Sequence, residues 1–235
     1  MSRSPIPLAL HGITRRQDDS TVLRDVSLAF GAEGFVMLVG DAGCRALLRV
    51  AGLLEAPDEG DVFVHGTGTC NLEEAERTGL RNRNFGFVFS APYLLPAMTV
   101  VENVAVPLFK ISESGVEEAQ LRSAEVFEFV GMADAGRLNA TELSAPEQSR
   151  VALARALVHR PSFLMVENAD TGLSAEDAAR FVLLLREVPK RFGTTVLAVL
   201  ATPIVAGPDD RILVIQQGEV QSDTRVPAAG AGAAQ

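Results

Sequence analysis

The sequence predicts an α/β fold in which a mostly parallel, helix-covered sheet carries an inserted helical lobe. Three observations predict it. Short apolar strand candidates alternate with helix candidates in the N- and C-terminal parts of the chain. Residues from about 97 to 160 carry a largely helical pattern instead. With 235 residues, 47% of them hydrophobic, the chain can bury a substantial core.

The N-terminal third is predicted to be rich in strands. Residues 20–30 end in a partly alternating apolar run, and residues 35–39 form a continuous apolar strand that Gly40 ends. Residues 46–54 are apolar on nearly every side, which predicts a buried helix. Two further short strands are expected at 61–65 and 85–89.

The remaining elements follow from similar patterns. A rough helical face runs from Val116 to Gly131 and predicts one helix. A second helix is predicted over 147–159, where Pro161 ends the pattern. A further helix should begin at Ser174, because Asp177 stands three residues later as in a capping box. Strands are expected at 163–166, 194–200 and 211–215, the last of them leading into a hairpin.

Composition excludes several classes of protein. The formal net charge of −9 argues against nonspecific binding to nucleic acid or to an anionic bilayer. No apolar run approaches the roughly 18 residues of a transmembrane helix. Cys44 and Cys70 have neither the spacing of a zinc site nor that of a disulfide framework. We therefore expect a cytoplasmic protein that reaches a membrane only through another protein.

A strand, a glycine turn and a buried helix over 35–54 have the layout of a phosphate-binding loop. Further segments carry a wider likeness: 57–60, 80–89, 94–104, 143–144 and 150–161. With these segments, the chain from about residue 8 to residue 220 resembles the ATP-binding subunit of ABC transporters, most nearly those of lipoprotein-release and macrolide-export systems.

The resemblance implies a P-loop NTPase-like core of three layers, with an antiparallel N-terminal β subdomain and a helical subdomain at about 91–160. Residues 1–226 would then form one nucleotide-binding domain, and the Ala/Gly-rich residues 227–235 a disordered tail. It also implies two partners, a membrane permease subunit and a homologous ATP-binding subunit in a homodimer or heterodimer, with no nucleic acid and no direct membrane insertion.

The phosphate-binding loop itself departs from the family pattern. A working loop reads G-x-x-x-x-G-K-S/T, in which the lysine reaches the phosphates and the hydroxyl binds magnesium. Counted from Gly40, the second glycine falls on Arg45 and the lysine on Ala46, and the segment is about three residues short. No lysine precedes Lys110. A vestigial site is therefore expected at Gly40, Asp41, Ala42, Gly43, Cys44 and Arg45.

Other positions of the resembled site are altered as well. The adenine-stacking aromatic is matched by Gln17, the magnesium-closing glutamine by Ser90, and the switch histidine by Ala201. The signature L-S-G-G-Q reads Leu143-Ser144-Ala145-Pro146-Glu147, in which Pro146 lacks an amide donor and Glu147 repels a phosphate. Of the two polar residues in L-S-G-G-Q, only the serine is kept. It is Ser144, which we add to the expected vestigial site.

In the resembled family, the end of the strand that matches 163–166 reads Asp-Glu and supplies a magnesium anchor and a general base. In this chain it reads Glu167-Asn168; Glu167 has the reach to bind a metal, but Asn168 cannot accept a proton. For Glu167 and Asp170, solvated turn residues are favoured over metal-site neighbours. Because loss of one catalytic group commonly costs about 100-fold to 10,000-fold, negligible turnover and no bound cofactor are expected.

A few other residues receive expectations. In the resembled family, the segment around Tyr93, Leu94, Leu95 and Met98 grips the permease, so partner contact is expected there. Cys44 is expected to be a small buried hydrophobe rather than a redox-sensitive thiol. Arg150 and Arg155 are expected to be solvated or paired with a carboxylate rather than to bind phosphate.

The sequence therefore favours a catalytically inactive transporter subunit that acts as a structural or regulatory partner of a permease. One alternative is a divergent but active export ATPase, with ATP and Mg²⁺ as cofactors and Arg45 and Glu167 as its working residues. Another is a soluble interaction protein without a permease.

Overall fold

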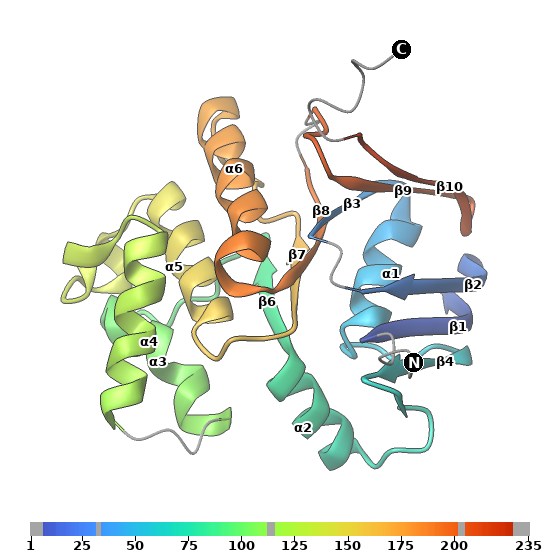
Figure 1. Cartoon of the computed structure of the whole chain (residues 1–235), viewed down its shortest axis with the longest axis horizontal. Coiled ribbons are helices and arrows are strands. Elements are labelled where there is room, and N and C mark those ends of the chain that lie inside the picture. The colour runs from blue at the N-terminus through green and yellow to red at the C-terminus, as the bar shows by residue number, and fades with distance from the viewer. Residues whose placement is uncertain (1–6, 32–33, 112–115, 202–204, 228–235) are drawn as a thin grey trace. The chain divides into compact units, whose positions relative to one another are not determined.

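The computed structural model describes residues 7–31, 34–111, 116–201 and 205–227 (Figure 1). The predicted tail therefore lies, apart from Pro227, outside the described residues. The chain divides into two compact units. The first comprises residues 1–81, 195–199 and 205–235, and the second comprises residues 82–194 and 200–204.

An antiparallel sheet forms one part of the first unit. Its strands are β1 (Leu8–Gln17), β2 (Ser20–Phe30), β4 (Glu59–Val64) and β5 (Thr67–Gly68), in the order β2-β1-β4-β5. Leu8 pairs with Phe30 on one side and with Val64 on the other, and all three side chains are fully buried. This is the antiparallel N-terminal sheet that the resemblance implied.

Parallel strands form the other part of the first unit. Strand β3 (Phe35–Gly40) pairs in parallel with β8 (Thr195–Val199) and with β9 (Arg211–Gln216), and β10 (Glu219–Arg225) folds back antiparallel to β9. Most residues of the apolar runs that predicted these strands are buried, as expected for parallel strands, although Val39 at the end of β3 is 43% exposed. The α/β prediction is thus confirmed.

Helix α1 (Ala42–Ala51) begins four residues earlier than predicted and ends three residues earlier. The prediction placed its start at Ala46 because the apolar run begins there. Asp41 instead caps the helix through a side-chain hydrogen bond to the Gly43 amide, so that the glycine turn is already helical.

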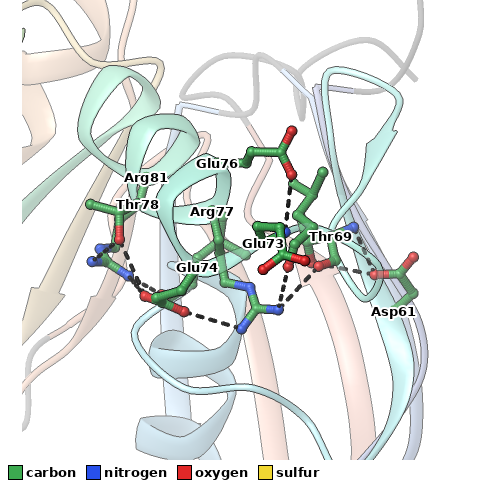
Figure 2. A network of polar contacts seen from close by, with 10 residues as sticks. Asp61, Thr69, Glu73, Glu74, Glu76, Arg77, Thr78 and Arg81 are labelled. Atoms are coloured by element: carbon green, nitrogen blue, oxygen red, sulfur yellow. Dashed lines mark hydrogen bonds and ion pairs between the residues drawn. The ribbon is translucent and has the colours of Figure 1, made fainter.

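Helix α2 (Glu74–Asn84) was not predicted, because no side chain of it is buried and its sequence therefore carries no apolar stripe. Polar contacts fix its first turns (Figure 2). Asp61 of β4 accepts a hydrogen bond from the Thr69 amide, 3.0 Å away, and Arg77 donates to the Thr69 carbonyl, 3.4 Å away. The helix is thus attached to the β4–β5 hairpin.

The second unit contains the parallel pair β6 (Phe85–Phe89) and β7 (Phe163–Glu167). Its helices are α3 (Val100–Ile111), α4 (Val116–Phe129), α5 (Ala145–Leu157) and α6 (Ala175–Phe192), with 3₁₀ turns at Ala133–Ala135 and Ala140–Glu142. Helix α5 approaches β6 so closely that a Cβ atom on Gly86 would lie 2.2 Å from the Ala156 carbonyl oxygen. Glycine is therefore required at this crossing.

Capping residues set the starts of two helices in this unit. Helix α6 begins after Ser174, as predicted, and the Ser174 hydroxyl accepts a hydrogen bond from the Asp177 amide. Helix α5 begins at Ala145, two residues before the predicted start, because Ser144 and Glu147 form a capping box. Among the described residues, no helix combines the length and the apolar character that a membrane crossing requires.

Candidate functional site

The connection between β3 and α1 is a single residue, Asp41, whose carboxylate is held by two backbone amides. One oxygen accepts from the Gly43 amide at 2.9 Å, and the other accepts from the Gln217 amide at 2.7 Å. The Asp41 amide in turn donates to the Ile215 carbonyl at 3.2 Å. The start of α1 is therefore tied to the β9–β10 hairpin.

Two glycines make this close connection possible. Gly40 has a φ of 145°, and a Cβ atom there would lie 1.7 Å from the Ile215 carbonyl oxygen. A Cβ atom on Gly43 would lie 2.7 Å from the Val22 carbonyl oxygen. Both glycines thus serve contacts with the chain's own backbone.

The predicted loop residues are brought together, but they do not fit the triphosphate and magnesium of a working loop. The first turn of α1 carries neither a lysine nor a hydroxyl, and the Gly43 amide already has an anionic acceptor. Ala42 and Arg45 are exposed beside it, and Gln17 is exposed at the end of β1.

Cys44 is buried at the start of α1, with 1% of its surface exposed. Burial raises the pKa of its thiol to about 11, and the nearby Asp41 charge contributes to the rise. The thiol is therefore protonated at neutral pH. The expectation of a small buried hydrophobe is confirmed.

In the second unit, β7 ends at the predicted metal and base positions. Glu167 is half-buried as the last residue of the strand, and Asn168 follows with a φ of 48°. Within the described ranges, no group of three or more His, Cys, Asp or Glu side chains could hold a metal ion. Metal binding by Glu167 stays a prediction.

Asp170 was expected to be a solvated turn residue, and this expectation is wrong. Only 1% of its surface is exposed, and its carboxylate accepts a hydrogen bond from the Ala201 amide at 2.8 Å. Ala201 occupies the predicted switch position with no polar side chain. No local sequence pattern points to this contact, because the two residues are 31 positions apart.

The signature position forms the start of α5. The Ser144 amide and hydroxyl both donate to one carboxylate oxygen of Glu147, at 2.8 and 2.6 Å. These hydrogen bonds lower the pKa of the Glu147 carboxyl below its ordinary value, so a negative charge sits at this helix N-terminus. Pro146 stands in the first turn, where an amide hydrogen has no helical partner. Ser144, like Ser90 after β6, is exposed.

The segment predicted to contact a permease is held in place by a residue that sequence reasoning did not single out. Asn103 is fully buried; it accepts from the Leu95 amide at 2.7 Å and donates to the Leu95 carbonyl at 3.1 Å and the Thr99 carbonyl at 3.0 Å. Tyr93 and Leu95 are 69% and 43% exposed. Leu94 and Met98, the other two predicted contact residues, are each partly exposed.

Arg155 of α5 holds the other end of the same segment. Its guanidinium donates to the Tyr93 carbonyl at 2.8 Å and to the Pro92 carbonyl at 2.5 Å. Burial lowers the pKa of Arg155. The expectation of a solvated or carboxylate-paired side chain is wrong, because backbone carbonyls are its partners.

Comparison with protein families decides the assignment. The family model described as ABC transporter matches residues 23–170. This chain belongs to the ABC transporter family. The lipoprotein-releasing system ATP-binding protein LolD of Bordetella pertussis is 36% identical over 86% of this ABC transporter chain and 88% of the relative. LolD of Bacteroides fragilis is 32% identical over 90% of this chain and 98% of that one.

Solved structures agree with this family. A dimeric ATP-binding cassette in a post-hydrolysis state, bound to ADP and Pi, matches with a TM-score of 0.81 and 27% identity, over 94% of this chain and all of that one. The resemblance and the P-loop NTPase-like fold are confirmed.

The expectation that no cofactor belongs to this chain is wrong. Relatives over most of its length are named ATP-binding proteins, and a solved neighbour contains ADP and Pi. The altered residues of this ABC transporter subunit therefore have to be compared with those of a site that binds ATP.

Proposed function

We propose that this ATP-binding-type subunit of an ABC transporter does not hydrolyse ATP and acts as a structural or regulatory partner of a membrane permease. The single observation that carries the proposal is the connection between β3 and α1. There the Asp41 carboxylate caps the helix, and neither a lysine nor a magnesium-binding hydroxyl is present.

The other altered positions support the same conclusion. Asn168 cannot accept a proton from water, and Ala201 has no side chain that could contact a phosphate. Loss of one such group commonly slows an enzyme by about 100-fold to 10,000-fold, and several are lost together here. Turnover should fall below detection.

The proposed partners are a permease and a homologous ATP-binding subunit, in a homodimer or heterodimer. The relatives named LolD belong to lipoprotein-releasing systems, and a solved neighbour is dimeric. Tyr93 and Leu95 are exposed apolar side chains on a segment fixed by Asn103 and Arg155, as a docking surface requires. The chain would then lie in the cytoplasm, peripheral to the membrane through the permease.

The first test measures phosphate release from ATP and Mg²⁺ by the purified chain. We expect no release above the protein-free blank. A second protein carries a G-x-x-x-x-G-K-S loop in place of residues 40–45 together with Asn168→Glu and Ala201→His, and a third carries only the two point substitutions. Phosphate release by the second protein, but not by the first or the third, would show that the missing groups are the cause of the lost hydrolysis. Release by the unaltered chain that Glu167→Gln abolishes would contradict the proposal.

One observation favours a divergent, active ATPase as a second candidate. Arg45 is exposed in the first turn of α1 and supplies a positive charge near the place of the missing lysine. A guanidinium fits a tight phosphate cradle less well than an ammonium does. ATP turnover that Arg45→Ala abolishes would support this candidate.

A further inference from the structure

We infer that Asp41 is a specificity-determining residue: its carboxylate takes the place of a nucleotide phosphate at the N-terminus of α1 and so weakens nucleotide binding by this chain. The inference deepens the proposed function, since it concerns the same loop. It predicts a gain of affinity when the carboxylate is removed, which loss of hydrolysis alone does not predict.

The first step is that this carboxylate meets the amides that an anion would need. The N-terminus of a helix carries a partial positive charge and amides without helical partners, and it attracts phosphate or carboxylate alike. Here both oxygens of Asp41 are used, one by Gly43 of α1 at 2.9 Å and one by Gln217 of the β9–β10 turn at 2.7 Å. The chain therefore supplies its own anion.

The second step is that backbone contacts, and not the Asp41 side chain alone, hold the start of α1. The Asp41 amide bonds the Ile215 carbonyl at 3.2 Å, and the close approach of Gly40 to the same carbonyl leaves no room for a Cβ atom. Asp41 itself is exposed. A rotation about its χ1 bond would free the Gly43 and Gln217 amides without moving the helix.

The third step concerns competition. A phosphate that approaches these amides meets a carboxylate already bonded to them, and the two negative charges repel each other at short range. The attached carboxylate loses little freedom when it binds, whereas a free nucleotide loses its translational and rotational freedom. The Asp41 carboxylate therefore binds these two amides more favourably than a nucleotide phosphate does.

The test compares the affinity of the full-length chain and its variants for ATP, ADP and pyrophosphate, each with Mg²⁺, by calorimetric titration. Asp41→Ala should bind ATP about tenfold more tightly than the unaltered chain. Asp41→Asn should lie between them, since its amide oxygen still caps the Gly43 amide but carries no charge.

The control is Asp61→Asn, because Asp61 also accepts from two backbone amides, those of Thr69 and Cys70, in the β4–β5 hairpin (Figure 2). It should leave the affinity unchanged.

A folded Asp41→Ala variant whose affinity is unchanged or weaker would overturn the inference. Asp41→Asn keeps the test decisive if the alanine variant fails to fold, because it retains the helix cap. An equal gain for Asp61→Asn would also overturn it, since the effect would then reflect net charge alone. ATP hydrolysis by the unaltered chain would refute the proposed function and leave the ratio of affinities standing.

Discussion

Single residues in this chain show how burial changes the chemistry of a side chain. His159 lies half-buried after α5, with its Nε2 atom 3.2 Å from the Phe85 carbonyl oxygen. Its Nδ1 atom is buried and has no hydrogen-bond partner among the described residues. Burial lowers the pKa of His159 below its ordinary value of 6.5, and the charge of Arg122 adds to the effect.

The unfolding free energy should therefore depend on pH through His159. The unfolded chain binds the proton more readily than the folded chain, so stability is fully present above pH 6.5 and is lost as the pH falls through the lower folded pKa. Urea unfolding at pH 7.5 and 5.0 should show a loss of the order of 1 kcal/mol that His159→Gln abolishes. An unchanged pH dependence in this variant would contradict the assignment.

At the scale of elements, agreement between sequence and structure follows the apolar pattern. Strands β3, β7 and β9 were predicted because their buried faces leave continuous apolar runs in the sequence. Helix α2 was missed because polar contacts, not burial, fix it. The start of α1 was misplaced because capping by Asp41 depends on a side-chain geometry that apolar periodicity does not record.

The candidate site follows the same rule. Matching positions in the family pattern pointed to Asn168 and Ala201, because each is a change of residue type at a known place, and their roles stay predictions. The hydrogen bonds of Asp170 and Asn103 could not be predicted, since each needs the folded path of the chain to bring its partner close. Arg155 was misjudged for the same reason.

Asn103 offers a test at this scale, because it satisfies the backbone of the 95–99 segment while fully buried. Asn103→Ala should lower the unfolding free energy by about 1–3 kcal/mol, since it leaves buried amide and carbonyl groups without partners. Asn71→Ala, at an exposed position, should change it by less than about 0.5 kcal/mol. Thermal and urea unfolding measure both. Equal effects would contradict the role given to Asn103.

Arg211 of β9 offers a second test. Its guanidinium makes two hydrogen bonds of 2.8 Å to Asp223 of β10 and one of 2.9 Å to the Ala29 carbonyl of β2, and it lies over the Phe30 ring. A lysine cannot reproduce these bonds together. Arg211→Lys should therefore lower the unfolding free energy by about 1–2 kcal/mol at neutral pH. Lys190→Arg, on the exposed end of α6, should have no measurable effect.

At the scale of the whole molecule, the net charge of −9 opposes binding to an anionic lipid surface, so the proposed route to a membrane is a permease. Co-expression with a candidate permease and affinity purification would test this. The double variant Tyr93→Ala, Leu95→Asp should lose the permease. Phe109→Asp, at a side chain 83% exposed on α3, should retain it. Retention by the double variant would place the docking surface elsewhere.

The attachment of Arg155 to the exposed segment has a mechanical consequence. Helix α5 carries Arg155 near one end and Ser144 at the other, and its close crossing with Gly86 keeps it pressed against β6. A helix of this length behaves as a stiff rod of about 20 Å. We therefore expect a displacement of Tyr93 to move α5 as a rigid body and so to displace Ser144 at its other end, whether or not this subunit hydrolyses ATP.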